Sequence, residues 1–560
     1  MPTALKNHRP VRTRSPFFIN CVPPTGTTIQ SASLSVKIKN GSRASAVTGN
    51  VLKTYTLSKT NAVDGIIVFD IAPLASDFLD HHYDQYIKYG YFSLSDNTDI
   101  SVNSNPIAER GRYLTVDIST SSFCNLKVGD KWYVTTPQFS GTGGSPCDSS
   151  YAEATWDVTV LSFTSSSIVF DYGEGNNVFY CMTTTTNAVN PIVFAHNNSA
   201  QADEILFIEV DKEIIVEGGD DPSPTEEHYT ANFGYGGFKD GVNFLPSSGG
   251  SGAYGSVQWT PTVNKQDDVT IMATDCYRQM GQNSYTILPI FTGEFDRNNP
   301  DVPTRGRIKW GAAEAGPHPN YDNTVKWLWF QPNAASSVTV NNIFDIEILP
   351  SDYMIDKVEQ SVTYLPIGKK NLCNNWIDGF DYLRVGHFVA REDLGSPYET
   401  AQNDLASVNA QGVLRYEIIC EPKYEVIDCL FVNKFGFWDS FSFLKKSMTQ
   451  MSTTESKYKR NIGEVVDNAY TYNLNAAQKL RYNVNGFKSI IVNTGFVNES
   501  FSLLLEEILL SESIVLIIDD VFTPVTIQTN QVEFKKSVND KLINYALTFD
   551  FAYNELNDVV

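Results

Sequence analysis

Four tryptophans in one Gly- and aromatic-rich segment are the first candidates for binding chemistry in this chain. Indole faces can stack on sugar rings while neighbouring acids and amides bind the hydroxyls. Alternate residues of a strand share one face, so the last two of the four would form one platform. Burial in the core of a β-sandwich is the favoured interpretation, and glycan binding is the alternative. The four residues are Trp259, Trp310, Trp327 and Trp329.

Catalytic spacings are scarce. The chain has no Gly-x-Ser-x-Gly and no His-Glu-x-x-His, which are the patterns of a serine-hydrolase turn and of a zinc-protease helix. The glycines at 249–252 are typical of a flexible loop. The paired carboxylates of a glycosidase need not be neighbours in sequence, so a glycan-degrading enzyme is the third-ranked hypothesis. We predict no catalytic residue and no enzymatic activity.

Two groups of side chains have the chemistry to bind a metal ion, without a consensus spacing. Four carboxylates in expected loops suit Ca²⁺, which we keep as an alternative to the predicted absence of any cofactor. They are Asp96, Asp99, Asp171 and Glu174. The second group borders a short helix expected at 74–86. It has no His-x-x-x-His pair, so a solvated helix face is favoured over a metal site. Its residues are Asp77, His81, His82 and Asp84.

The charge balance bears on the partners that the chain can have. The 560 residues include 42 basic and 64 acidic side chains, for a net charge of −22. Nucleic-acid binding needs a positive footprint, so it is not expected, and solubility is the simplest explanation of the excess acid. The basic N-terminus lacks the apolar region of a signal peptide. We expect no membrane insertion, and we expect folding in the bacterial cytoplasm before release by lysis.

Length and composition predict several β-rich domains. Apolar residues make up 42% of the chain, aromatic residues 12% and charged residues 19%, which supplies packed cores and favours strands. Eight scattered cysteines without a Cys-x-x-Cys are typical of reduced thiols. We expect an N-terminal β-sandwich at 1–106 completed at about 200–217, an inserted small β-barrel-like domain at 107–199, a jelly-roll-like domain at 225–350 and a C-terminal β domain at 351–560.

The C-terminal segment has the most regular pattern. Residues 543–551 alternate, so that Tyr545 and Phe549 share an apolar face. Asn485-Gly486 separates two apolar stretches and predicts a tight hairpin turn. Asn498 can cap a helix with apolar residues at helical spacing. That stripe consists of Phe501, Leu504, Leu505, Ile508 and Leu509. The expected fold class is therefore mainly β, with sandwich, jelly-roll and small-barrel domains and one amphipathic helix on the C-terminal sheet.

Several stretches at the two ends of the chain resemble a known family. CLFVNKFGFWDSFSF at 429–443, the segment 503–527 and KSVNDKLINYALTFDF at 536–551 carry most of the resemblance, together with SPFFIN at 15–20 and FDIA at 69–72. They are similar to virion structural proteins of tailed phages and prophages of Bacteroidota hosts, the crAss-like and flavobacterial phages among them. Residues 107–350 match nothing in that family.

The resemblance implies a role in the tail, neck or baseplate of a virion and no catalytic activity. Within the first stretch Gly436 would form a tight turn, Trp438 would anchor the core and Asp439 would bind backbone. Tyr545 and Phe549 would belong to the same framework. The chain would be a homo-oligomer in contact with other tail or neck proteins. The alternative is an adhesin on the same particle that attaches to a host surface glycan through the tryptophans.

Overall fold

The chain is mainly β, as the sequence predicts, and consists of several antiparallel sheets with three short α-helices among the described residues. The computed structural model describes residues 11–23, 26–40, 51–60, 62, 65–83, 89–94, 100–102, 113–117, 123–124, 126–136, 139–140, 150–151, 154–164, 166–172, 192–196, 204–220, 225–236, 269–274, 276, 278–292, 328–331, 344–346, 361–372, 382–385, 414–421, 423–529, 531–534 and 543–556.

The first sheet joins the N-terminal segment to residues beyond 200. In the order β1-β18-β16-β3-β4 its strands are Val11–Arg12, Thr225–Asn232, Leu206–Val216, Ile29–Asn40 and Val51–Lys59, and β17 (Gly219–Asp220) pairs with β16. Because side chains alternate along β3, Leu34, Val36 and Ile38 are all fully buried. They meet β2 (Phe18–Cys21), β5 (Ile67–Asp70) and α2 (Ala72–Ser76) in one hydrophobic core.

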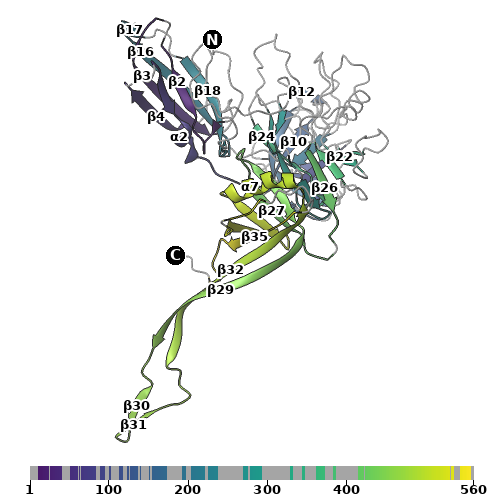
Figure 1. Cartoon of the computed structure of the whole chain (residues 1–560). Coiled ribbons are helices and arrows are strands. Elements are labelled where there is room, and N and C mark those ends of the chain that lie inside the picture. The colour runs from purple at the N-terminus through teal and green to yellow at the C-terminus, as the bar shows by residue number, and fades with distance from the viewer. Residues whose placement is uncertain are drawn as a thin grey trace.

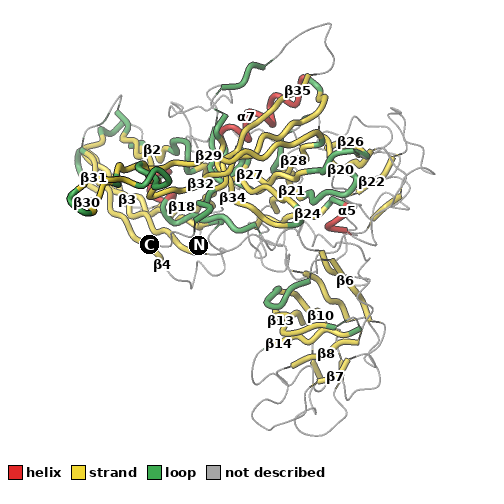
Figure 2. The backbone as a smooth tube through the Cα atoms, turned by 90° about the horizontal axis from the view of Figure 1, so that it is seen from below, coloured by secondary structure: helices red, strands yellow, loops and turns green. Residues whose placement is uncertain are grey.

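A second sheet is formed entirely within residues 89–196. In the order β7-β8-β14-β13-β10-β15-β6-β9 its strands are Ile100–Val102, Tyr113–Asp117, Ser167–Asp171, Ala154–Phe163, Lys131–Thr136, Ile192–His196, Tyr89–Leu94 and Phe123–Cys124. Trp132 is buried there beside Phe170, with ring centroids 5.8 Å apart. Figure 2 shows this sheet projecting from the rest of the chain. A short separate pair consists of β11 (Phe139–Ser140) and β12 (Ser150–Tyr151).

Two further sheets cross the domain boundary expected near residue 350. The first, β19-β21-β24, consists of Val269–Ile271, Ile287–Thr292 and Ser361–Pro366. The second, β20-β26-β25-β22-β23, consists of Arg278–Gly281, Leu414–Ile419, Tyr382–Val385, Leu328–Gln331 and Phe344–Ile346. Strand β24 leads into the short helix α5 (Lys369–Leu372). Strands on both sides of residue 350 therefore pair within each of these sheets, and such long-range pairing leaves no local signal in the sequence.

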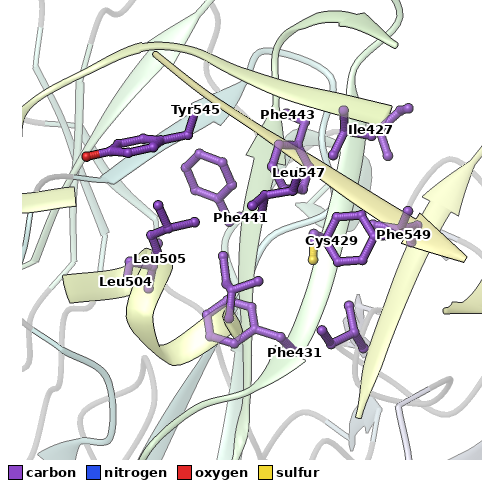
Figure 3. Packing of buried hydrophobic residues seen from close by; sticks show 14 of the residues in the cluster. Ile427, Cys429, Phe431, Phe441, Phe443, Leu504, Leu505, Tyr545, Leu547 and Phe549 are labelled. Atoms are coloured by element: carbon purple, nitrogen blue, oxygen red, sulfur yellow. The ribbon is translucent and has the colours of Figure 1, made fainter. Parts of the chain in front are cut away.

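The C-terminal sheet carries an extensive apolar core. In the order β28-β27-β33-β34-β35-β32-β29 its strands are Trp438–Phe443, Ile427–Val432, Ile514–Ile518, Val521–Ile527, Ile543–Phe551, Lys479–Val497 and Lys445–Lys459. Figure 3 shows Phe441, Leu547 and Phe549 of the sheet packed near Leu504 and Leu505 of the helix α7 (Ser502–Leu510).

The predicted helix is confirmed together with its cap. The Ser500 backbone N–H donates to the Asn498 side chain at 3.2 Å, at the start of a 3₁₀ turn, η6 (Glu499–Phe501), that leads into α7. Phe501, Leu505 and Ile508 are fully buried. The apolar stripe therefore attaches the helix to the sheet, as its spacing predicts.

The hairpin predicted at Asn485-Gly486 is wrong. Strand β32 runs straight through both residues, with Asn485 opposite Thr454. The left-handed residue here is Asn483 (φ +50°), which lies at a bulge where the register shifts. Pairing along the whole of β29 outweighs the local preference of Asn-Gly for a turn.

Strands β29 and β32 continue past the sheet as a long two-stranded projection (Figure 1). At its end β30 (Gly463–Val466) pairs with β31 (Ala469–Tyr472) around Asp467 and Asn468, whose φ angles are +52° and +62°. A two-residue turn with both φ angles positive matches the right-handed twist of a hairpin. We call residues 451–488 the arm, and residues 463–474 its tip.

Candidate functional site

The turn between β27 and β28 has the tight conformation expected of Gly436. Gly436 adopts φ +85°, where a side chain is strained. Its N–H donates to the Asn433 carbonyl at 2.9 Å, and the Asn433 N–H donates to the Phe437 carbonyl at 2.9 Å. The Asn433 side chain accepts from the Phe435 N–H at 3.0 Å. The turn is thus closed by its own residues.

This turn lies directly against the end of the first sheet. The Asn232 side chain donates to the Phe435 carbonyl at 2.7 Å, and the Tyr235 N–H donates to the Lys434 carbonyl at 2.8 Å. A Cβ on Gly234 would lie 2.9 Å from the Phe435 carbonyl oxygen, so the two backbones leave no room for side chains. Residues about 200 positions apart therefore form one rigid junction between two sheets.

Two arginines of the basic N-terminus strengthen the junction. The Arg12 guanidinium lies 5.3 Å from the centre of the Phe435 ring, and it donates to the Tyr235 carbonyl at 2.9 Å. The Arg14 guanidinium lies 5.2 Å from the Tyr235 ring, and its Nε is 3.0 Å from a Glu512 carboxylate oxygen. These cations bind aromatic faces and one acid. No local pattern in the sequence predicts these partners, because the contacts are long-range.

Trp438 is a core anchor, as the residue types at 429–443 predict. It is 1% exposed and belongs to a cluster that joins β28 to residues of β21, β24, β27 and β33. The rings of Tyr83 and His81 meet it edge-on, at centroid distances of 5.7 and 5.9 Å. His81 also meets the Phe233 ring at 5.1 Å. His81 therefore packs in the junction rather than on the solvated helix face that its sequence context favours.

Asp439 makes a stronger contact than the backbone bond that was expected of it. It does accept from the Ser440 N–H at 2.8 Å, but its main partner is Arg278, whose two Nη atoms lie 2.8 and 2.9 Å from its oxygens. Both side chains are buried. Burial alone would lower the pKa of Arg278, but the groups around it, Asp439 first among them, together raise that pKa above its ordinary value. In the sequence Arg278 is a single cation at the start of a short strand, and this pattern does not predict a buried ion pair.

Tyr545 and Phe549 occupy the apolar face of β35 that their alternation predicts. The Tyr545 ring lies 6.3 Å from that of Phe501, and the Phe549 ring lies 6.1 Å from that of Phe443. The Tyr545 N–H donates to the Thr494 hydroxyl at 3.1 Å. Both aromatic side chains therefore hold the sheet and the helix segment together.

Two further carboxylates are buried close to the junction. The Tyr285 N–H and the Ser442 hydroxyl donate to Asp428 at 2.8 and 2.7 Å. Burial raises the pKa of Asp428 to about 7, although these two hydrogen bonds lower it. Burial likewise raises the pKa of Glu507, which accepts from the Thr274 hydroxyl. Since both carboxylates are enclosed and bonded by their own chain, they serve as internal hydrogen-bond acceptors.

The glycan-binding and calcium hypotheses fall largely outside the described residues. This applies to Trp259, Trp310, Trp327, Asp96, Asp99 and Glu174, and also to Asp84 of the second candidate metal group. Trp329 lies in β22, where its backbone is in register with Asp345 and Arg384. Asp171 ends β14 opposite Tyr113. The described residues contain no group of three metal-ligating side chains. None of their helices is both long and apolar enough to cross a bilayer.

The arm presents apolar side chains to solvent, above all at its tip. Leu474 is 85% exposed, Val465 69% and Tyr470 68%. Large apolar groups gathered on an exposed element are typical of contact surfaces. The alternating sequence of β29 and β32 predicts strands, but not that they leave the sheet.

The arm also carries the opposite charge to the rest of the chain. Residues 451–488 contain six basic and three acidic side chains, for a net charge of +3, against −22 for the whole chain. The remaining residues therefore sum to −25, from −22 − 3. The cations of the arm are Lys457, Lys459, Arg460, Lys479, Arg481 and Lys488.

Comparison with known proteins shows no family for this chain. No family model matches the chain, and no curated protein matches it. Among solved structures, a biofilm-associated protein BSP domain is similar to the chain at 9% identity, over 88% of this chain and 96% of that one, with a TM-score of 0.11. E. coli alpha-2-macroglobulin in its native conformation is similar at 6% identity, over 85% of this chain and 27% of that one, with a TM-score of 0.12. Scores this low carry no argument about fold or function.

Proposed function

We propose that this chain is a structural component of a bacteriophage virion, in the tail, neck or baseplate, and that it acts by oligomeric assembly. The observation that carries the assembly part is the arm with its exposed apolar tip. An isolated two-stranded hairpin is at best marginally stable in water, and a long open edge invites pairing with other chains. An element of this kind suits a particle in which a neighbouring chain covers it.

The junction between the first sheet and the C-terminal sheet supports the same proposal. The Arg278–Asp439 pair, the Gly436 turn and Trp438 hold the C-terminal sheet rigidly against its neighbours. An assembly protein needs such a rigid attachment, because contacts with neighbouring chains would transmit force to the arm. The virion itself is proposed from the motif resemblance at 429–443 and 536–551.

Two measurements test the proposal. Light scattering of the purified chain, followed by class averages in the electron microscope, should show a closed ring or another symmetric oligomer. Mass spectrometry of particles sedimented from lysates of cells that carry the gene should recover the chain at a fixed ratio to the other particle proteins. Recovery only in the soluble fraction of lysates that contain particles would contradict a virion role.

A further inference from the structure

Like charges face each other along the base of the tip. In the register of β29 and β32, Lys459 lies opposite Lys479, and Lys457 lies opposite Arg481. Glu455 pairs with both members of the second pair. No described carboxylate lies within salt-bridge distance of Lys459 or Lys479. Directly opposed like charges destabilise a strand pair, so the base of the tip is built for an acidic neighbour.

The outer face of α7 has the complementary character. Leu503 and Leu510 are 48% and 46% exposed, and Glu506 is exposed between them at helical spacing. Glu499 extends the same face by one turn. Near it, Phe496 is 59% exposed. On this face of α7 apolar side chains alternate with carboxylates. The face therefore complements the apolar side chains of the tip and the cations at its base.

The residues around this face have the same sign of charge. Residues 497–560 contain eleven acidic and three basic side chains, for a net charge of −8. Of the acids on and beside α7, Glu512 is already bound by Arg14, whereas Glu499 and Glu506 point to solvent. These two carboxylates are therefore the partners that an external cation would meet.

The arm cannot serve the helix of its own chain. Figure 1 shows the tip at the far end of the arm, pointing away from the C-terminal sheet and α7. A second copy of the chain supplies the same acidic and apolar face in a position that the tip can reach. A contact between two different surfaces of identical chains is heterologous, and it builds a ring or a helical stack.

We propose that the tip of the arm of one copy binds the outer face of α7 in the next copy. The tip places Val465, Tyr470 and Leu474 against Leu503 and Leu510, while Lys459 and Lys479 meet Glu499 and Glu506. This contact rests on the proposed oligomeric assembly and names its interface. Since the charged groups lie at the rim of the contact, the assembly weakens as salt rises.

A charge-swap experiment tests the contact. The arm variant is Lys459→Glu with Lys479→Glu, and the helix variant is Glu499→Lys with Glu506→Lys. Each places like charges across the contact and should raise the dissociation constant of the self-assembled chain at least ~10-fold in sedimentation velocity. An equimolar mixture of the two variants should regain the parent's assembly, because each arm then meets an oppositely charged helix. All four positions are exposed, and circular dichroism checks that the variants fold.

The matched control for the arm variant is Lys53→Glu with Lys131→Glu. It makes the same change of net charge as the arm variant, at exposed positions on two other sheets. It should assemble like the parent. If the parent is oligomeric and either charge variant keeps its mass, or the mixture fails to recover, the arm–helix contact is wrong while assembly stands. A parent that stays monomeric at high concentration overturns the contact, as does an arm that binds DNA or anionic vesicles instead. The virion proposal is then still decided by the particle mass spectrometry.

Discussion

Gly436 and Gly234 lie so close together that a Cβ added to Gly436 would be 2.4 Å from the Gly234 nitrogen. No real Cβ tolerates that distance, and the neighbouring atoms are backbone, which cannot move aside. The contact joins the β27–β28 turn to the end of the first sheet. The geometry of the junction therefore depends on two residues without side chains.

Gly436→Ala should lower the free energy of unfolding by about 2–4 kcal/mol, because it adds both a strained φ angle and a backbone clash. Urea unfolding of the purified chain measures it. Gly65→Ala is the matched control, since Gly65 has φ +77° and open space around it. It should show the cost of the angle alone, about 1 kcal/mol. Equal losses for the two variants would show that the close approach to Gly234 has no energetic weight.

Trp438→Ala should remove a fully buried indole and leave a cavity among Tyr83, His81 and Tyr364. The expected loss is roughly 3–5 kcal/mol, measured by chemical denaturation. Tyr472→Ala, at a tip position that is 58% exposed, should change stability by less than ~0.5 kcal/mol. A Trp438→Ala variant as stable as the parent would contradict the placement of this residue in the core.

Arg278→Met should be more damaging than removing both members of its ion pair. The single change leaves Asp439 charged and unpaired in the interior, at a cost of about 3–5 kcal/mol. In the double variant Arg278→Met/Asp439→Leu no buried charge is left without a partner, so part of that loss should return. A double-mutant cycle from denaturant unfolding measures the coupling. Strictly additive losses would mean that the two side chains do not depend on each other.

Asp428 should make the folded chain less stable as pH rises toward neutrality. Its pKa is about 7 in the folded chain, against an ordinary value of 3.8. Between these values the folded state keeps a proton that the unfolded chain has lost, so the contribution of Asp428 to stability is greatest below pH ~4 and falls as pH rises to about 7. The loss from this group is at most ~4 kcal/mol.

Asp428→Asn should flatten that part of the pH profile, because an amide can still accept from the Tyr285 N–H and donate to the Ser442 hydroxyl. Denaturant unfolding between pH 4.5 and 7.5 measures it. The exposed Asp117→Asn variant should retain the parent's profile. An unchanged slope in Asp428→Asn would assign the pH dependence to other groups.

Features with a short period could be read from the sequence. The alternation around Tyr545 and Phe549 and the stripe from Phe501 to Ile508 both place their apolar residues in the core, because a strand or a helix repeats every few residues. The cap at Asn498, the turn at Gly436 and the core position of Trp438 are local consequences of residue type. Asn485-Gly486 shows the limit of such signals, since fifteen residues of β29 hold it in an extended strand.

Residue types and their short-range spacing are enough to predict a mainly β chain, the position of the amphipathic helix, and the residues of the 429–443 motif that form the turn and the anchor. Three features become visible only in the folded chain: Arg278 binds Asp439 across 161 positions, strands pair across residue 350, and β29 and β32 leave their sheet as an arm. The difference arises because local preferences act between near neighbours. Buried ion pairs, strand partners and uncovered edges depend on which distant segments the folded chain brings together.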